Sequence, residues 1–265
     1  MTTGTATLLG CEDLRVTVPG RTLVDGLDLD VCSGEFVAVL GQNGAGKSLT
    51  LLTLAGLRPA DAGAVRLVDR DIFLAARQWV ARQLALLPQV IDDIFPATVM
   101  ETALIGRHPH IGDFQWESAA DLAIAELALR SMRLDTLVDR DILTLSGGER
   151  RRLAIAQVLT QAPDVYLLDE PTNHLDPQHQ LDALRVFRDA ADAGAAVVAS
   201  LHDVNLAVRF ADRCLLLFGD GRWDCGRSHE ILNADTLSEL YSTQMEAVHW
   251  RSHDLFVASS GDVTC

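Results

Sequence analysis

The glycine-rich segment 41–48 constrains this chain more than any other part of it. The segment follows the apolar run Glu35–Leu40 and matches the pattern GxxxxGK[ST], with Gly41, Gln42, Asn43, Gly44, Ala45, Gly46, Lys47 and Ser48. Glycines let the backbone curl so that successive N–H groups point at one anion, and a following helix adds the partial positive charge of its N-terminus. The pattern predicts a phosphate cradle between a strand and a helix, in which Lys47 contacts the terminal phosphates and Ser48 is placed for Mg²⁺.

The charge balance limits what such a cradle can serve. The sequence has 22 basic and 37 acidic residues and a net charge of −15. This balance disfavours the clustered cations that non-specific binding to DNA or RNA requires, so we expect no nucleic-acid partner. Lys47 is the single lysine beside 21 arginines. Codon bias explains the excess of arginine, yet the remaining lysine stands where a compact ammonium suits a phosphate.

The apolar segments alternate in a way that predicts an α/β fold. We expect strands over 14–18, 23–31, 35–40, 64–68, 165–168 and 195–201, a hairpin of 214–218 with 222–225, and helices over 46–57 and 181–193. Buried strands that alternate with helices imply a mostly parallel sheet with helices on both faces. Residues 92–162 are rich in helical periodicity and are expected to form an insertion into that sheet.

Two acidic residues, Asp169 and Glu170, close the apolar strand Val165–Leu168. Side chains at the carboxyl end of a parallel strand face the crevice where α/β sheets bind ligands. Asp169 is placed to hold Mg²⁺ through water, and Glu170 to polarise a water for in-line attack on a γ-phosphate. Such a pair is also common at a plain strand end, so this interpretation depends on the cradle upstream.

The segment Leu145–Glu149 precedes an amphipathic run, Arg150–Leu159. Ser146 and Glu149 have the S-x-x-E spacing of a capping box, which predicts the start of a helix. A cap alone does not explain Gly147 and Gly148 in the first turn, where each glycine costs up to ~1 kcal/mol. Glycines there expose backbone N–H groups to an anion. We therefore infer a second phosphate-binding helix end, which serves the nucleotide of another subunit.

Six features occur in the order and spacing typical of ATP-binding cassette (ABC) ATPases: the cradle, Gln89, Leu145–Glu149, Val165–Glu170, Asn173–Asp176 and His202. The resemblance covers about residues 10–230. It implies an α/β fold of the P-loop NTPase (RecA-like) type: a mostly parallel sheet core with an N-terminal antiparallel β subdomain and an inserted α-helical subdomain. In the implied single domain, residues 1–91 and 160–233 are the discontinuous ATP-binding core, 92–159 the helical subdomain and 234–265 a C-terminal tail.

The resemblance also implies roles for individual residues. It assigns ATP binding to the cradle and Leu49, and Mg²⁺ to Ser48, Gln89 and Asp169, with Gln89 also linking the site to a transmembrane partner. It places Asp176 in a loop that crosses a dimer seam. Ser146, Gly147 and Gly148 resemble the segment that closes over the γ-phosphate of the opposite protomer. Glu170 and His202 are the expected catalytic residues, His202 through contact with the γ-phosphate and the attacking water.

Val18 departs from the family pattern, which usually has an aromatic residue there for adenine to stack on. Because base–aromatic stacking is worth ~1–3 kcal/mol, the sequence predicts weaker ATP binding than in relatives with the aromatic residue.

Three stretches resemble ATPases of the cobalamin, iron-siderophore and haem uptake group: 95–99, 106–110 and 175–180. This likeness implies the ATP-hydrolysing subunit of an importer. Its homodimer would drive separate transmembrane permease subunits, supplied indirectly by a periplasmic or surface substrate-binding protein. The expected location is the cytoplasmic side of the bacterial inner membrane, peripheral through the permease. Residues 90–97 are expected to line the groove for a coupling helix of the permease, or else to form a plain surface loop.

Two alternatives stay open: a non-transport cassette ATPase of translation or DNA repair, and the ATPase of another transporter type. Non-transport relatives usually carry two cassettes or a long coiled coil, whereas Lys47 and Ser146 are 99 residues apart, which leaves room for a helical subdomain only. No stretch approaches the ~20 apolar residues of a membrane span, so a pore must come from another chain. The five cysteines lack CxxC spacing, which predicts neither disulfide nor zinc. In the tail, Tyr241, Trp250 and Phe256 pack on the core or support a regulatory contact.

Overall fold

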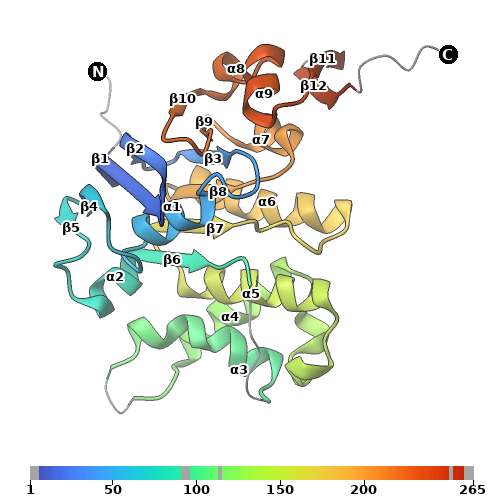
Figure 1. Ribbon diagram of the computed structural model, residues 1–265. Helices are drawn as coiled ribbons and strands as arrows, with labels where there is room; N and C mark the ends of the chain where they lie inside the picture. The colour runs from blue at the N-terminus through green and yellow to red at the C-terminus, as the bar shows by residue number, and fades with distance from the viewer. Residues whose placement is uncertain (1–5, 91–95, 113–114, 251–252, 260–265) are drawn as a thin grey trace, which may run out of the picture.

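The structure is a computed structural model of the 265-residue chain, and it describes residues 6–90, 96–112, 115–250 and 253–259. Most of the predicted groove for a coupling helix falls on residues 91–95, which lie outside these ranges. The two larger β-sheets lie side by side, with a group of helices at one end of the molecule and the C-terminal elements, which include a two-stranded sheet, at the other (Figure 1).

A six-stranded sheet forms the centre of the molecule, in the order β10-β9-β3-β8-β7-β6. Its strands are β3 (Phe36–Leu40), β6 (Leu84–Leu87), β7 (Val165–Asp169), β8 (Ala196–Ser200), β9 (Arg213–Leu217) and β10 (Trp223–Arg227). All neighbours pair in parallel except the edge strand β10, which is antiparallel to β9 and forms the predicted hairpin. Every residue of β3, β7 and β8 is buried, because helices or the second sheet cover both faces.

The second sheet is antiparallel and has the order β2-β1-β4-β5. It consists of β1 (Thr7–Val18), β2 (Arg21–Cys32), β4 (Ala62–Leu67) and β5 (Arg70–Asp71). The predicted start of the first strand at Leu14 was wrong, because β1 begins at Thr7. A register shift between Cys11 and Leu14, with Asp13 at φ 49°, interrupts the alternation on which that prediction rested.

Helices α1 (Lys47–Leu54), α6 (Pro177–Asp192) and α7 (Val204–Phe210) pack on the central sheet. The alternating side chains of β3 divide two cores. Phe36, Ala38 and Leu40 join residues of α6 and α7, whereas Val37 and Val39 join α1 and the antiparallel sheet. Helix α6 begins one turn earlier than predicted, because the Asp176 side chain caps it and Pro177 stands at its first position.

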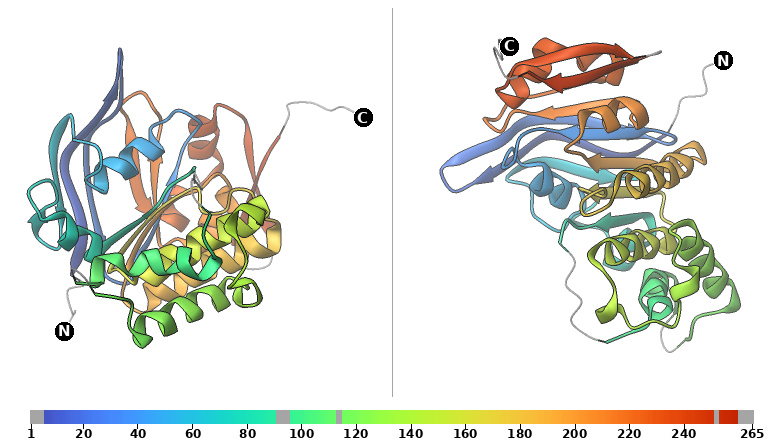
Figure 2. Two further views of the ribbon diagram at one scale, coloured as in Figure 1. Left: turned by 90° about the horizontal axis from the view of Figure 1, so that it is seen from below. Right: turned by 90° about the vertical axis from the view of Figure 1, so that its right-hand side faces the viewer.

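The inserted helices are α3 (Val99–Leu104), α4 (Ala119–Ser131) and α5 (Gly147–Gln161), with the short 3₁₀ helices η1 (Ile105–His110), η2 (Asp135–Leu137) and η3 (Ile142–Thr144). They gather on one side of the molecule (Figure 2). A buried ion pair, Arg107 Nε to Asp121 Oδ1 at 2.8 Å, joins η1 to the start of α4. Helix α2 (Arg77–Gln83), which the sequence pattern did not predict, precedes β6.

The C-terminal elements are α8 (Ser228–Ile231), α9 (Ala234–Tyr241) and the hairpin of β11 (Met245–Trp250) with β12 (His253–Ala258). Phe256 is buried against the core, as packing of the tail predicts, but Trp250 is 53% exposed. The four cysteines within the described residues are free thiols. Among the helices of those residues, none combines the length and the apolar character that crossing a bilayer requires.

Candidate nucleotide-binding site

The predicted cradle is the loop that joins β3 to α1. Residues 41–46 connect the end of β3 at Leu40 to the start of α1 at Lys47. Two glycines fix its path. A Cβ at Gly41 would lie 2.4 Å from the Leu217 carbonyl oxygen, and Gly46 has φ 105° with the Leu23 side chain 3.1 Å from the position of a Cβ. Only glycine therefore lets the loop curl this tightly between β9 and β2.

Lys47 is 95% buried within this loop, at 5% exposure. Its ammonium donates to the carbonyl oxygens of Gly41, at 2.7 Å, and Gln42, at 3.2 Å. Burial lowers the pKa of Lys47, and the nearby Glu170 and Asp169 act against this by favouring the charged form. Among the described residues no carboxylate bonds this ammonium directly, so the cation is available to an anion that enters the loop.

Glu170 lies at the centre of a cluster of polar side chains. Its carboxylate accepts hydrogen bonds from the Gln89 amide, at 2.8 Å, and from the Asn173 amide. His202 Nε2 lies 2.5 Å from the other carboxylate oxygen. The Glu170 backbone has φ 50°, a left-handed conformation that is strained for a residue with a side chain. A buried glutamate on a strained backbone is typical of a functional position, and here its carboxylate faces a cleft.

Asp169 is held from the next strand. Ser200, the last residue of β8, donates from its hydroxyl to Asp169 Oδ1 at 2.7 Å and accepts the Glu170 backbone N–H at 2.9 Å. Strands β7 and β8 are parallel neighbours, and Asp169 pairs with Ser200 in their register. One hydroxyl thus fixes both acidic residues at the carboxyl end of the sheet.

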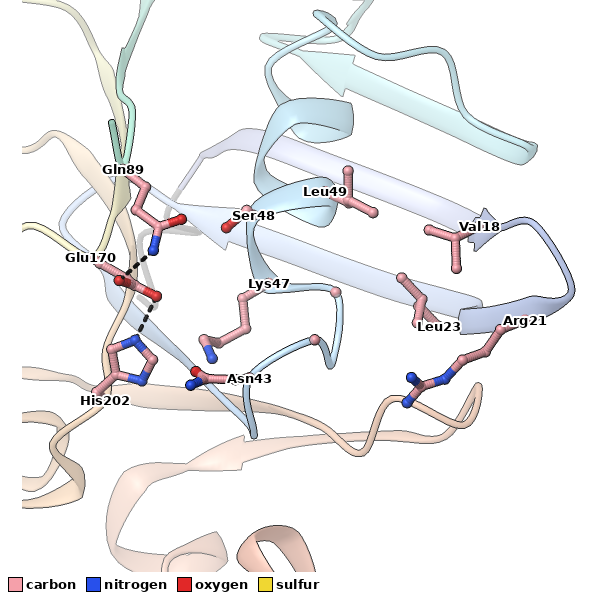
Figure 3. Close-up of a pocket in the computed structure, with 12 residues that line it drawn as sticks. Val18, Arg21, Leu23, Asn43, Lys47, Ser48, Leu49, Gln89, Glu170 and His202 are labelled. Atoms are coloured by element: carbon pink, nitrogen blue, oxygen red, sulfur yellow. Dashed lines mark hydrogen bonds and ion pairs between the residues drawn. The ribbon is translucent and has the colours of Figure 1, made fainter. Parts of the chain in front are cut away.

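A cleft of about 540 Å³ brings the cradle and the Glu170 cluster together. Figure 3 shows Gln89, Glu170 and His202 at one end, Lys47 and Asn43 in the middle, and Val18, Leu23 and Arg21 at the other end. The volume is within the usual range for small-ligand sites. The cleft is lined by Val18, Arg21, Leu23, Asn43, Gly44, Gly46, Lys47, Ser48, Leu49, Gln89, Glu170 and His202.

Other predicted site residues lie away from this cleft. Ser146 caps α5 in the predicted capping box with Glu149, and Gly147 and Gly148 form the first turn. Asp176 caps α6 and also contacts His179 Nδ1 at 2.9 Å. None of these four residues lines the cleft. The single chain therefore carries the capped glycine turn and the cradle as separate surfaces.

Four residues with a part in the site were not among the predicted site residues: Arg21, Leu23, Arg151 and Ser200. Ser200 had a detectable signal, because it is the one polar residue that ends an otherwise apolar strand, Ala196–Ser200. Arg21 lines the cleft beside Val18 and donates from Nε to the Gly219 carbonyl at 2.7 Å. Arg151 contacts backbone far away in the sequence, so no local pattern indicates its role.

The parallel sheet, the glycine loop before α1 and the acidic end of β7 define a P-loop nucleoside triphosphatase. A family model described as ABC transporter matches residues 24–173, more than half of the chain. The chain therefore belongs to the ABC transporter family and has the fold of its ATPases.

Individual relatives agree with this placement. A hemin import ATP-binding protein HmuV of Pseudomonas fluorescens is 38% identical over 258 residues, which cover 95% of this chain and 100% of the relative. A cobalamin import ATP-binding protein BtuD of Halobacterium salinarum is 37% identical over 239 residues and covers 89% of this chain, which spans only 59% of that relative. A solved ABC transporter described as of the metal-chelate type, in an inward-facing conformation, superposes with a TM-score of 0.83 at 28% identity, covering 97% of this chain and 99% of its own.

Proposed function

We propose that this chain is the ATP-hydrolysing subunit of an importer, and that two copies act head to tail on two ATP molecules. The observation that carries the proposal is the separation, within one chain, of the cleft from the capped glycine turn at Ser146–Gly148. Each surface is the N-terminal end of a helix, α1 or α5, where the first backbone N–H groups lack partners within the helix and can bind an anion. In a head-to-tail pair each cleft would be closed by the partner's glycine turn.

The chain's own groups support hydrolysis in this cleft. The N–H groups of the cradle and the Lys47 ammonium would hold the phosphates. Glu170, which the Gln89 and Asn173 amides orient, would accept a proton from the attacking water. His202, close to the same carboxylate, would contact the γ-phosphate. We also propose that the chain is divided into an ATP-binding core, the helical subdomain 92–159 and a C-terminal tail.

Ser48 and Gln89 line the cleft, and Asp169 precedes the lining residue Glu170 without lining the cleft itself. The oxygen donors of these three residues fit a magnesium ion. Ser48 offers a hydroxyl, Gln89 an amide oxygen and Asp169 a carboxylate, and such oxygen ligands together with phosphate oxygens are what Mg²⁺ takes in nucleotide sites. When bound, Mg²⁺ would neutralise charge on the phosphates. The described residues contain no group of three or more His, Cys, Asp or Glu side chains that could hold a metal without phosphate ligands.

A metal chelate is the class of cargo that the relatives support. Their names refer to hemin and cobalamin, and the solved structure is described as of the metal-chelate type. The partners we propose are transmembrane permease subunits, which place this chain at the cytoplasmic side of the membrane, and indirectly a substrate-binding protein. A non-transport cassette ATPase is the competing hypothesis.

Dimer formation tests the composite site. Glu170→Gln should bind Mg-ATP and become dimeric in light-scattering measurements without turnover, whereas Glu126→Gln, a matched change at an exposed position of α4, should behave like the wild type. Adding Gly148→Asp to Glu170→Gln should retain ATP binding and abolish the dimer. A Glu170→Gln protein that binds ATP and stays monomeric would contradict the head-to-tail arrangement.

Copurification tests the importer. Tagged protein should bring down a polytopic permease from its own membranes, and ATPase activity of that complex should rise when chelate-loaded binding protein is added. Full activity without any membrane partner, together with copurification of ribosomes or DNA-repair proteins, would favour the non-transport hypothesis instead.

A further inference from the structure

Arg151 is a buried arginine whose guanidinium bonds only to backbone carbonyls in the described contacts. It stands in the second turn of α5 and is 3% exposed. Nη1 donates to Pro88 O at 2.7 Å and Gln89 O at 3.4 Å. Nη2 donates to Asp169 O and Glu170 O, both at 2.7 Å, and Nε to Pro171 O at 3.4 Å.

These carbonyls belong to two segments that carry the reactive side chains. Strands β6 and β7 are parallel neighbours, and residues 88–89 and 169–171 lie where the two strands end. Gln89 and Glu170 come from these segments and are hydrogen-bonded to each other. The planar fork of an arginine can bind both segments at once, which a point-like ammonium cannot do.

The same contacts support the strained backbone of Glu170. A left-handed residue with a side chain persists only where its surroundings hold it. Around Glu170, Ser200 accepts the backbone N–H and Arg151 donates to the carbonyl. Two groups from two different elements thus fix the peptide units on both sides of this residue.

We propose that Arg151 is a positioning residue for ATP hydrolysis, which holds the Gln89 and Glu170 backbones together and couples their position to helix α5. The proposal rests on the proposed role of Glu170. Helix α5 begins at the Ser146 cap, so the glycine turn that would receive a partner's nucleotide and the guanidinium that fixes this chain's own glutamate belong to the same helix. A shift of α5 on partner binding would therefore move both catalytic segments.

The charge of Arg151 suits this role. Burial lowers its pKa to about 10, while the charges of Asp169 and Glu170 favour its protonated form. The guanidinium thus stays charged at neutral pH, and its carbonyl contacts are charge-assisted hydrogen bonds.

Helix α5 offers a matched control in the next residue. Arg152 is half-buried and also donates to backbone carbonyls, those of Met132 at 2.7 Å and Arg133 at 3.2 Å, but these lie at the end of α4, away from the cleft. Arg151→Gln should lower kcat about tenfold or more with KM for ATP changed less than about threefold, because the change affects positioning and not nucleotide binding. Arg152→Gln should retain kcat, with thermal unfolding of each variant reporting its folding.

Arg151→Lys provides a second measurement if the glutamine variant does not fold. It keeps the charge and is expected to bind one segment only, so its kcat should lie between those of Arg151→Gln and the wild type. The inference is overturned if Arg151 variants turn over like Arg152→Gln, or if their loss is confined to KM. If either result is found while Glu170→Gln is inactive, the role of Arg151 is wrong but the proposed function still stands. A Glu170→Gln protein with wild-type turnover would overturn both.

Discussion

The Ser200 hydroxyl ties together both acidic residues of the site, donating to Asp169 at 2.7 Å while it accepts the N–H of Glu170 at 2.9 Å. Ser200 is fully buried at 0% exposure, so neither bond can be replaced by bulk water. Ser200 does not line the cleft. It nevertheless helps to fix the positions of Asp169 and Glu170, whose carboxylates the proposed chemistry uses.

Ser200→Ala should therefore destabilise the protein and raise the Mg²⁺ concentration that it needs for half-maximal ATPase activity. Leaving a buried carboxylate oxygen and a buried N–H without this partner costs about 1–3 kcal/mol in the free energy of unfolding. Urea unfolding measures this cost, and a titration of ATPase activity with Mg²⁺ measures the concentration for half-maximal turnover, which should rise.

Ser228→Ala is the matched control for this variant. Ser228 is buried and its hydroxyl donates to Ala211 O at 2.7 Å, on the far side of β9 from the acidic pair. It should lose a similar part of the unfolding free energy and keep the wild-type Mg²⁺ dependence. An unchanged Mg²⁺ dependence in Ser200→Ala would show that the hydroxyl acts on stability alone.

Lys47→Met should abolish ATP binding without lowering the stability of the nucleotide-free protein. Burial lowers the pKa of Lys47 below its ordinary value of about 10.5, so the folded state binds this proton less tightly than the unfolded chain. The resulting cost is fully present below the folded pKa and disappears as the pH rises toward the unfolded value of about 10.5. The wild type should thus gain stability relative to Lys47→Met over that alkaline window, measured by urea unfolding.

ATP provides the control for this variant, because it should raise the thermal midpoint of the wild type and leave that of Lys47→Met unchanged. A nucleotide-free variant that is more than about 1 kcal/mol less stable than the wild type at neutral pH would mean that the bonds to Gly41 and Gln42 outweigh the cost of burying the charge.

The parts of the site that the residues alone predicted are those with local causes, whereas Gln89 and His202, which meet Glu170 across 81 and 32 residues, were predicted only through the family resemblance. The strand, glycine loop and helix around residues 36–54 are contiguous, and the Ser146–Glu149 box is closed by bonds between residues three apart. The start of α6 had local signals as well, an aspartate cap followed by a proline, and the prediction overlooked them. Local hydrogen bonding and backbone preference are sufficient for these elements.

The contacts that were not predicted join segments distant in the sequence. Arg151 Nη1 reaches Pro88 across 63 residues, and Ser200 reaches Asp169 across 31. Both depend on the order of strands in the sheet, which places the ends of β6, β7 and β8 side by side. Periodicity predicts that these strands are buried but does not specify which of them are neighbours.

Val18→Tyr should tighten ATP binding. Val18 lies at the end of the cleft opposite Glu170, with Arg21 and Leu23 (Figure 3), and a ring there would add base stacking worth ~1–3 kcal/mol. Calorimetric titration of the Glu170→Gln background, which should bind ATP without hydrolysing it, measures the change in Kd. Val18→Ile, which adds bulk without a ring, should leave Kd close to that of the valine protein. An equal Kd for tyrosine and valine would show that the base does not occupy this end of the cleft.

The Asn205 side chain bonds the C-terminal hairpin to the segment that follows His202, so Asn205→Ala should loosen the hairpin. The Asn205 amide donates to Phe256 O at 3.1 Å and accepts the Phe256 N–H at 2.8 Å. The resulting open state should raise hydrogen exchange at the Phe256 amide about tenfold, while the amides of β3 and β8 keep their protection. Asn205→Asp retains the acceptor for the Phe256 N–H and should leave that amide protected. His202 and Asn205 line the same surface hollow as Tyr241 and Phe256, so Phe256 also packs near this segment. Unchanged hydrogen exchange in Asn205→Ala would mean that this packing alone holds the hairpin in place.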